Sequence, residues 1–214
     1  MYVKSRMTAN PITVSSETSV ADAYELLLKH KVRRLPVVDN GKLVGIVTDK
    51  ELQQLTPSKA TTLSIYEINY LLAKTKVKEA MTSGVYTTTP DALLEEAAAV
   101  MRDHKVSALP VLDGEKLVGI ITETNIFDAF TDLLGVKENG SRVTVAAEDT
   151  PGSLSRLTKI IGDEGININR LAVYRGEGTE CQVVITINSI NTDALQQTLD
   201  EQGFKVLHIS KNHA

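Results

Sequence analysis

Apolar positions along the first 134 residues alternate between short strand-like runs and helical spacing, and the same alternation occurs in each half. Aliphatic side chains three and four positions apart indicate helices, and short apolar runs that end in polar turns indicate strands. Both halves give the order strand, helix, two strands, helix. The expected elements cover residues 12–14, 20–31, 34–38, 43–47 and 49–55, and then 86–88, 92–104, 109–112, 117–121 and 123–134. The pattern therefore predicts two βαββα units.

The two units share one register without a gap. The stretch from Met7 to Asp49 matches Met81 to Glu123, 74 residues later, at 17 of 43 positions, and 13 of the 19 positions from His30 to Thr48 are identical. A fixed register over such a span indicates one structural unit built twice.

The rest of the chain predicts a connector and a third unit. A helix over residues 65–73 carries too many aliphatic residues for a solvated tether, so the segment is expected to pack. After a predicted hinge at residues 137–141, the order becomes βαββαβ, the ferredoxin-like arrangement. The predicted fold is thus α+β (α/β-like in the first two units). The expected boundaries are 1–56 and 77–135 for the repeats, 57–76 for the connector and 142–211 for the third unit.

Composition narrows the functional classes. With 42% hydrophobic and 23% charged residues, the chain of 214 residues is typical of a globular protein. The net charge of −4 and the lack of a dense basic cluster argue against nucleic acid as a partner. A single cysteine, Cys181, cannot form an intrachain disulfide, and no long apolar run indicates a membrane segment, so a cytoplasmic location is expected.

Signatures of catalysis are missing from the sequence. The four histidines and Cys181 are scattered without the spacing of metal ligands, and no glycine-rich loop of the nucleotide-hydrolase kind occurs. We therefore expect no enzymatic activity, no metal and no catalytic cofactor.

Thr48 and Thr122 carry the clearest chemical signal. Each follows a Gly-aliphatic-aliphatic run and precedes a predicted helix. A helix start presents free N–H groups and a positive dipole end, which suit a phosphate, and the hydroxyl adds a donor. Glu51 and Asn125 lie three residues further on, where they could hold ribose hydroxyls. The alternative is that both threonines serve only as helix caps.

Both repeats resemble the cystathionine-β-synthase (CBS) domain. The resemblance rests on the Met-Thr start, on Leu35-Pro36-Val37-Val38-Asp39 and its copy at 109–113, and on the Gly-aliphatic-aliphatic-Thr end. It covers roughly residues 1–134 and implies a Bateman module, a CBS pair with two clefts for adenosine-containing ligands such as AMP or ATP. The positions implied to contact a nucleotide are Thr13, Arg33, Arg34, Thr48 and Glu51, and Thr87, Ser107, Ala108, Thr122 and Asn125.

The chain departs from the family pattern at two of these positions. The family has Asp as the ribose ligand where this chain has Glu51 and Asn125. Arg33 and Arg34 occupy positions that often contact phosphate, whereas the second unit has Ser107 and Ala108 there. Arginine suits phosphate oxygens because its planar fork offers several donors. The two clefts are therefore expected to differ in affinity for phosphates.

The third unit is similar to the ACT domain. The resemblance rests on the run from Asp149 to Leu154, which contains Pro151-Gly152, and on Gly165-Ile166-Asn167. ACT domains commonly pair side by side and often bind amino acids, which implies Asp149, Gly152 and Asn167 as ligand positions. Good turn chemistry is the alternative explanation for these residues.

The order CBS–CBS–ACT resembles the AcuB group of acetoin-utilisation proteins. It implies a regulator in acetoin or carbon metabolism that senses an adenine nucleotide or related adenosyl ligand. The ACT unit would serve for dimerisation or as a second effector site, and a homodimer and a target protein are the expected partners. The alternative hypothesis is a non-catalytic scaffold with vestigial clefts.

Overall fold

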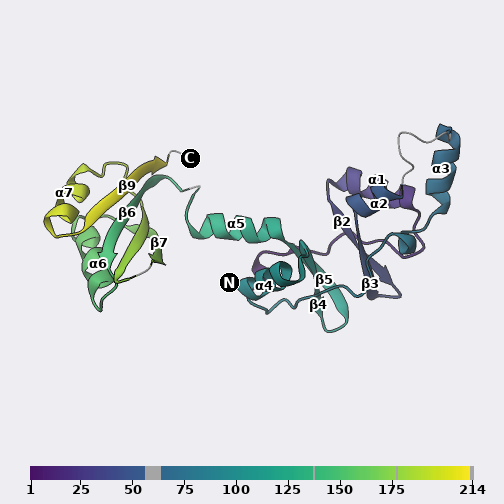
Figure 1. The fold of residues 1–214 in the computed structure, drawn as a ribbon, viewed down its shortest axis with the longest axis horizontal. Helices are drawn as coiled ribbons and strands as arrows, with labels where there is room; N and C mark the ends of the chain where they lie inside the picture. The colour runs from purple at the N-terminus through teal and green to yellow at the C-terminus, as the bar shows by residue number, and fades with distance from the viewer. Residues whose placement is uncertain (56–63, 137, 177, 213–214) are drawn as a thin grey trace. The chain divides into compact units, whose positions relative to one another are not determined.

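The computed structural model describes residues 1–55, 64–136, 138–176 and 178–212. The chain divides into two compact units, Met1–Ile126 and Phe127–Ala214, whose elements are labelled in Figure 1. Both mix helices and strands, so the predicted α+β class is confirmed.

The first repeat contains a hairpin between two helices. Its elements are α1 (Val20–His30), β2 (Arg34–Asp39), β3 (Lys42–Thr48) and α2 (Asp49–Gln54). The hairpin pairs Arg34 with Thr48 at its open end and closes through Asn40 and Gly41, both at positive φ (49° and 78°). Asn-Gly is favoured in a tight two-residue hairpin turn, because it tolerates this backbone conformation.

The second repeat has the same plan. Its elements are α4 (Leu94–His104), β4 (Ala108–Asp113), β5 (Lys116–Thr122) and α5 (Glu123–Leu133). The hairpin pairs Ala108 with Thr122, the positions equivalent to Arg34 and Thr48. The common sequence register is therefore also a common strand register.

The predicted strands at 12–14 and 86–88 are wrong in extent. Each is a single parallel bridge, Val14 to Val37 and Thr88 to Val111. The next bond of a parallel ladder would need the amide of Pro36 or Pro110, and proline has none. The proline in each Leu-Pro-Val sequence therefore limits the parallel pairing to one bridge.

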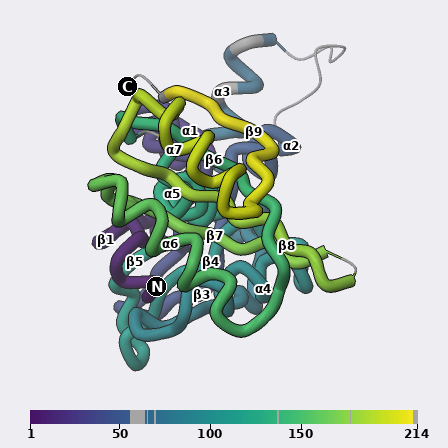
Figure 2. The backbone as a smooth tube through the Cα atoms, turned by 90° about the vertical axis from the view of Figure 1, so that its left-hand side faces the viewer, coloured from purple at the N-terminus to yellow at the C-terminus, as the bar shows by residue number. Residues whose placement is uncertain are grey.

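The segment that precedes each repeat, residues 3–9 or 77–82, pairs with the hairpin of the other repeat, and we call these two the leading segments. Strand β1 (Thr8–Ala9) pairs with β5 of the second repeat, and the N-terminal segment lies beside β5 in Figure 2. The equivalent Thr82 bridges Ile46 in β3 of the first repeat. The two repeats therefore complete one another's sheets.

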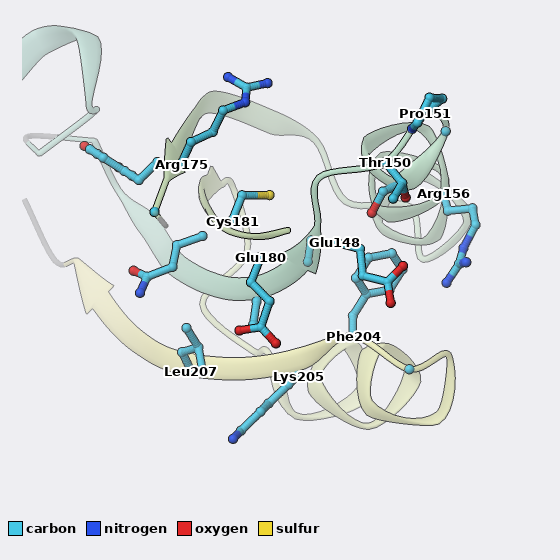
Figure 3. A pocket seen from close by; sticks show the side chains of 18 residues that line it. Glu148, Thr150, Pro151, Arg156, Arg175, Glu180, Cys181, Phe204, Lys205 and Leu207 are labelled. Atoms are coloured by element: carbon cyan, nitrogen blue, oxygen red, sulfur yellow. The ribbon is translucent and has the colours of Figure 1, made fainter. Parts of the chain in front are cut away.

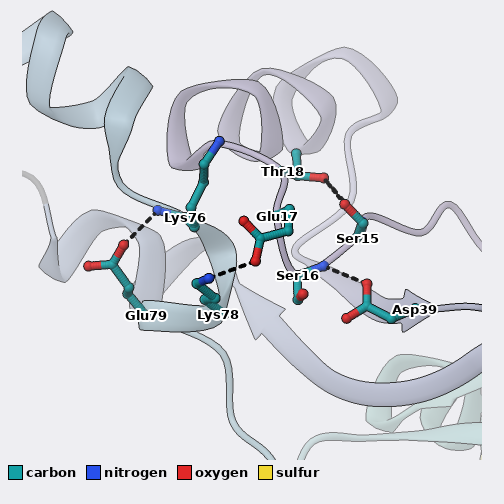
Figure 4. Close-up of polar contacts among 8 residues, drawn as sticks. All are labelled: Ser15, Ser16, Glu17, Thr18, Asp39, Lys76, Lys78 and Glu79. Atoms are coloured by element: carbon teal, nitrogen blue, oxygen red, sulfur yellow. Dashed lines mark hydrogen bonds and ion pairs between the residues drawn. The ribbon is translucent and has the colours of Figure 1, made fainter.

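Short 3-10 turns anchor the exchanged segments. In η1 (Val3–Ser5), the Val3 amide donates to the Ala92 carbonyl at 2.9 Å, and in η2 (Val77–Glu79) the Val77 amide donates to the Thr18 carbonyl at the same distance. Exposed ion pairs at 2.6 Å repeat the symmetry, Lys4 with Asp91 and Lys78 with Glu17. Figure 4 shows Lys78 with Glu17, and Ser16 donating its amide to Asp39.

These contacts raise the pKa of the lysines and lower the pKa of the aspartate. The hydrogen bond and the charge of Asp91 raise the pKa of Lys4, and Glu17 raises the pKa of Lys78 in the same way. Donors on Ser16 lower the pKa of Asp39. Because these groups are exposed, the contacts fix geometry more than they stabilise the fold.

Two glycines allow the exchanged segments to pack closely. A Cβ on Gly45 would lie 2.8 Å from Met81 Sδ and 3.0 Å from the Thr82 carbonyl oxygen. A Cβ on Gly119 would collide with Met7 Sδ and lie 3.2 Å from the Thr8 carbonyl oxygen. Glycine is needed here because backbone and methionine approach its Cα directly.

The connector contains α3 (Ile65–Lys74), as expected. Ser64 caps it, accepting from the Glu67 amide at 3.4 Å, and the helix packs on α1. Two of its tyrosines, Tyr66 and Tyr70, are exposed. The Thr56-Pro57-Ser58 run lies outside the described residues.

The second compact unit holds one four-stranded sheet with α6 and α7 on one face (Figure 1). Its strand order is β7-β8-β6-β9, the ferredoxin-like order. The core is aliphatic, with Leu157 and Ile161 of α6 and Leu195 and Leu199 of α7 against the sheet. The elements are β6 (Gly140–Glu148), α6 (Ser153–Asp163), β7 (Ile168–Arg175), β8 (Glu180–Ile187), α7 (Asp193–Glu201) and β9 (Lys205–Asn212).

The exchange of leading segments gives a testable coupling. Replacing Gly119 with Ala should destabilise the fold by about 1–3 kcal/mol, because the new methyl group overpacks against Met7. In urea unfolding, Met7→Ala should recover part of this loss, with a coupling of about 1 kcal/mol. Met81→Ala is the matched control, since Met81 lies against Gly45. Equal coupling of Gly119→Ala to both methionines would contradict the exchange.

Candidate functional site

The two predicted threonines cap their helices. Thr48 Oγ1 accepts from the Glu51 amide, and Thr122 Oγ1 accepts from the Asn125 amide, each at 3.3 Å. Both hydroxyls also donate to the side chain three residues on, at 2.9 Å to Glu51 and 2.8 Å to Asn125. Capping is therefore real at both sites, and any ligand contact has to come in addition to it.

In the first repeat the groups at the helix start already have partners. Glu51 accepts from the Thr48 amide at 2.7 Å and from Thr82 Oγ1 of the exchanged segment at 2.8 Å, so both carboxylate oxygens are engaged. The Asp49 amide donates to the Arg33 carbonyl at 3.1 Å and the Lys50 amide to Asp49 Oδ1 at 2.9 Å. A nucleotide at α2 would have to displace these bonds.

The second repeat leaves donors at the start of α5. Asn125 uses only Oδ1 to cap Thr122, at 2.9 Å from the amide, so its Nδ2 group has no partner within the described part of the chain. The same holds for the Thr124 amide, whereas the Glu123 amide donates to the Ser107 carbonyl at 3.2 Å. Helix α5 thus offers an amide nitrogen, an amide side chain and a positive dipole end.

Two arginines of the first repeat reach this helix start. Arg33 Nη2 donates to Thr124 Oγ1 at 3.3 Å, and Arg34 Nη1 donates to the Ser107 carbonyl through a short contact. Both bonds cross from one repeat to the other within the unit Met1–Ile126. The structure therefore brings the predicted phosphate residues of one repeat to the helix of the other.

Charges of both signs surround Arg34 in this cluster. Burial lowers the pKa of the half-buried Arg34, and the like charge of Arg33 lowers it further, while Glu123 and Asp49 act more weakly in the opposite direction. Arginine stays protonated in proteins, so the like charges of Arg33 and Arg34 repel one another. An anion bound between the two guanidinium groups would relieve that repulsion.

Of the remaining predicted nucleotide residues, Ser107 and Ala108 lie at this helix start, whereas Thr13 and Thr87 lie elsewhere along the hairpins. Ala108 is buried and lies opposite Thr122, and the Ser107 carbonyl accepts from Arg34. Thr13 is exposed and adjoins the bridge of Val14 to Val37. Thr87 is exposed too, and it lines a hollow of about 430 Å³ between the two hairpin turns.

The predicted ACT ligand residues do not gather within one chain. Asp149 follows the end of β6 and pairs with Arg175 at 2.7 Å, which raises the pKa of Arg175. Asn167 precedes β7 near the start of β6, about 25 Å away along the sheet, and its amide donates to Asn188 Oδ1 at 3.0 Å. Gly152 begins α6 at a φ of 88° with open space around its Cα.

A large hollow adjoins Gly152. It measures about 1040 Å³ and lies at the β6–α6 turn, the end of β7, the start of β8 and the start of β9 (Figure 3). Charged side chains of both signs line it: Glu148, Glu180, Arg156, Arg175 and Lys205. Arg156 lies over the Phe204 ring at 5.1 Å. The hollow could accept a small zwitterion.

Sequence reasoning missed several of these residues. Thr124, Thr82 and Phe204 are ordinary surface or core residues by pattern, and only long-range contacts give them a role. The exchanged segments had a signal, because Val3-Lys4 recurs as Val77-Lys78 in the repeat register.

Within the described residues, no group of three or more His, Cys, Asp and Glu side chains is arranged to hold a metal ion. Over the same part of the chain, every helix is too short or too polar to cross a membrane.

Family models match most of the chain. The CBS domain model matches residues 3–55 and 77–132, and the ACT domain model matches residues 141–204. The chain is also 29% identical over 199 residues to the inosine-5'-monophosphate dehydrogenase of Aquifex aeolicus, covering 89% of this chain. It spans only 36% of the length of that relative.

Three solved structures resemble the CBS pair. The AcuB acetoin utilization protein of Vibrio cholerae is 32% identical with a TM-score of 0.53, covering 64% of this chain and 96% of that one. CBSX2 of Arabidopsis thaliana in complex with AMP is 35% identical with a TM-score of 0.51, covering 61% and 96%.

The third structure is a CBS domain pair in complex with 5'-methylthioadenosine and S-adenosyl-L-methionine. It is 31% identical with a TM-score of 0.52, covering 62% of this chain and 97% of that one. Family models, hairpin register and exchanged segments agree on the first two repeats, and the sheet order agrees on the third unit. The chain belongs to the CBS-domain family, as a tandem CBS pair followed by an ACT domain.

Proposed function

We propose that the CBS pair binds an adenine nucleotide with its phosphate at the start of α5, and that the chain is a ligand-sensing regulatory protein. The observation that carries the proposal is the convergence of Arg33 and Arg34 on a helix start whose Thr124 amide has no partner in the described part of the chain. Similarity to a CBS pair that binds AMP supports the adenine nucleotide.

The phosphate is held by charge and by directed donors. Its oxygens accept from the Thr124 amide and from the guanidinium groups of Arg33 and Arg34. To reach them, the Arg34 fork leaves the Ser107 carbonyl, which keeps the Glu123 amide as a donor. Binding therefore exchanges a neutral acceptor for an anionic one, and charge-assisted hydrogen bonds are the stronger ones.

The ribose and the adenine contact residues next to the phosphate site. Asn125 Nδ2 donates to a ribose hydroxyl in the role that Asp has in the family, and Thr122 orients Asn125. Thr87 and the buried Ala108 border the adenine side. In the first repeat, Thr48, Glu51 and Thr13 form a weaker second cleft because Glu51 is held by Thr82.

The regulatory mechanism is a population shift. A ligand that bridges both repeats stabilises one relative arrangement of them, in proportion to its difference in affinity for the two states. A difference of about 1–3 kcal/mol suffices for a useful switch. The response reaches a target protein in the cytoplasm, in acetoin or related carbon metabolism, as the AcuB similarity suggests.

The ACT unit supplies dimerisation and a second effector site. The hollow beside Gly152 offers charges of both signs, which fits an amino acid. Because Asp149 and Asn167 lie at opposite ends of the sheet, a site that uses both would need two copies of the unit side by side. This arrangement supports a homodimer.

One observation favours a second candidate function, a structural scaffold. The helix start of the first repeat is internally satisfied, as expected of a cleft that no longer binds. A scaffold in which both clefts are vestigial would show no response to any adenosyl compound.

Mutation of Arg34 tests the phosphate site. AMP should raise the melting temperature of the chain in a concentration-dependent manner. At an AMP concentration of 100 times Kd, the free energy of unfolding should increase by about 2.7 kcal/mol. In titration calorimetry, Arg34→Ala should weaken AMP binding about tenfold or more, since it removes a charge-assisted bond. Lys50→Ala, a basic residue on α2, is the matched control. Undiminished AMP affinity in Arg34→Ala would refute this site.

Asymmetry between the repeats gives a second prediction. Asn125→Ala should weaken AMP binding about tenfold, because Nδ2 is the free ribose donor. Glu51→Ala should leave the affinity within about twofold and instead lower stability, because it removes the Glu51 side of the capping box at the start of α2. A larger loss of affinity in Glu51→Ala than in Asn125→Ala would place the nucleotide in the first repeat.

Charge selectivity gives a third prediction. AMP should bind at least about tenfold more tightly than 5'-methylthioadenosine, which lacks the phosphate, and the gap should narrow with added salt. Calorimetry at low and high salt measures both affinities. Equal affinities would show that Arg33 and Arg34 do not contact the ligand.

A further inference from the structure

Helix α5 ends in a defined stop. The Gly135 amide donates to the Asp132 carbonyl at 3.1 Å and the Val136 amide to the Thr131 carbonyl at 3.2 Å. Gly135 has a φ of 67°, so these two bonds form a Schellman motif. The last turn therefore has a fixed shape.

Side chains of the ACT sheet bind this last turn. Thr186 Oγ1 of β8 donates to the Leu134 carbonyl at 3.1 Å, and Arg170 Nε of β7 donates to the Asp132 carbonyl at 3.4 Å. Arg170 also forms an ion pair with Glu138 at 2.7 Å. A cation at a helix C-terminus is stabilised by the dipole. We call Arg170, Thr186 and Glu138 the α5 clamp.

Close packing reinforces the clamp. A Cβ on Gly135 would lie 3.1 Å from Arg170 Cγ and 3.3 Å from Thr186 Cγ2, and a Cβ on Gly140 would collide with the Ile187 carbonyl. The expected hinge at residues 137–141 is therefore wrong in its described part: Glu138 is paired and Gly140 begins β6. Lys137 lies outside the described residues.

We propose that the α5 clamp transmits nucleotide binding at the start of α5 to the sheet of the ACT unit. The last turn of α5 and the ACT sheet belong to one compact unit, Phe127–Ala214, while the first turn of the same helix begins at Glu123, beside the candidate phosphate site. Helix α5 has 11 residues, about 16 Å from end to end. A change at its start is passed to β7 and β8 through Arg170, the positioning residue.

The inference rests on the proposed function, because it needs a ligand at α5. It adds a route: the regulatory output passes through a helix that the sheet holds by its C-terminal carbonyls. Without the clamp, α5 could respond to AMP while the ACT unit stayed unchanged.

Hydrogen exchange of the full chain tests the route. In the wild type, AMP should slow amide exchange in β7 and β8 at least about threefold, since ordering at α5 is passed on. Arg170→Ala should still bind AMP by calorimetry, yet lose this response. Lys159→Ala, which removes an exposed ion pair of 2.8 Å with Asp163 in α6, is the matched control and should keep it. An AMP response retained in Arg170→Ala would overturn the proposal.

A ligand-free arm separates the two proposals. Without AMP, Arg170→Ala should speed exchange of the Gly135, Val136 and Glu138 amides about tenfold, because the last turn loses its partners. Unchanged rates would overturn the clamp, whether or not AMP binds. If the clamp behaves as stated but calorimetry detects no AMP binding, the proposed function fails and the transmission route fails with it, while the anchored turn stands.

Discussion

The exchange of leading segments is the constraint on which the CBS pair depends. Met7 packs on Gly119 and Met81 on Gly45, so each sheet is completed by the other repeat. This reciprocal packing holds the two repeats face to face. In that arrangement Arg33 and Arg34, at the start of the hairpin of one repeat, reach the start of the helix that follows the hairpin of the other. The candidate site is thus a consequence of how the repeats pair.

Duplication produced two equal frameworks with unequal chemistry. In both repeats the hairpin ends at a threonine that caps the next helix. The threonine accepts from the amide of the residue three positions on, which is Glu51 in the first repeat and Asn125 in the second. A carboxylate at position 51 attracts Thr82 and closes its own helix start, whereas an amide at position 125 keeps two donors. Arg33 and Arg34 belong to the first repeat, but their side chains donate hydrogen bonds at the start of α5 in the second repeat. The backbone is shared, so the two helix starts differ through the side chains at three equivalent positions, Arg33 and Ser107, Arg34 and Ala108, and Glu51 and Asn125.

The sequence predicts what is local. The Asn-Gly turn, the caps at Thr48 and Thr122 and the aliphatic core of the third unit follow from residue type and spacing. Contacts between distant segments do not follow from it: Arg33 meets Thr124 across 91 positions, and Arg170 meets the carbonyl of Asp132 across 38. The shortened strand at 12–14 was foreseeable, since Pro36 lacks the amide that would extend it. The hinge expectation failed because polar composition resembles a linker even where Glu138 is ion-paired and Gly140 begins a strand.

A crystal structure of the chain with AMP tests the central claim most directly. The account predicts phosphate oxygens at hydrogen-bonding distance, about 2.7–3.2 Å, from the Thr124 amide and the Arg34 guanidinium, with Arg34 released from the Ser107 carbonyl. A phosphate bound at the start of α2, or an AMP-bound chain in which Arg34 still contacts Ser107, would contradict it.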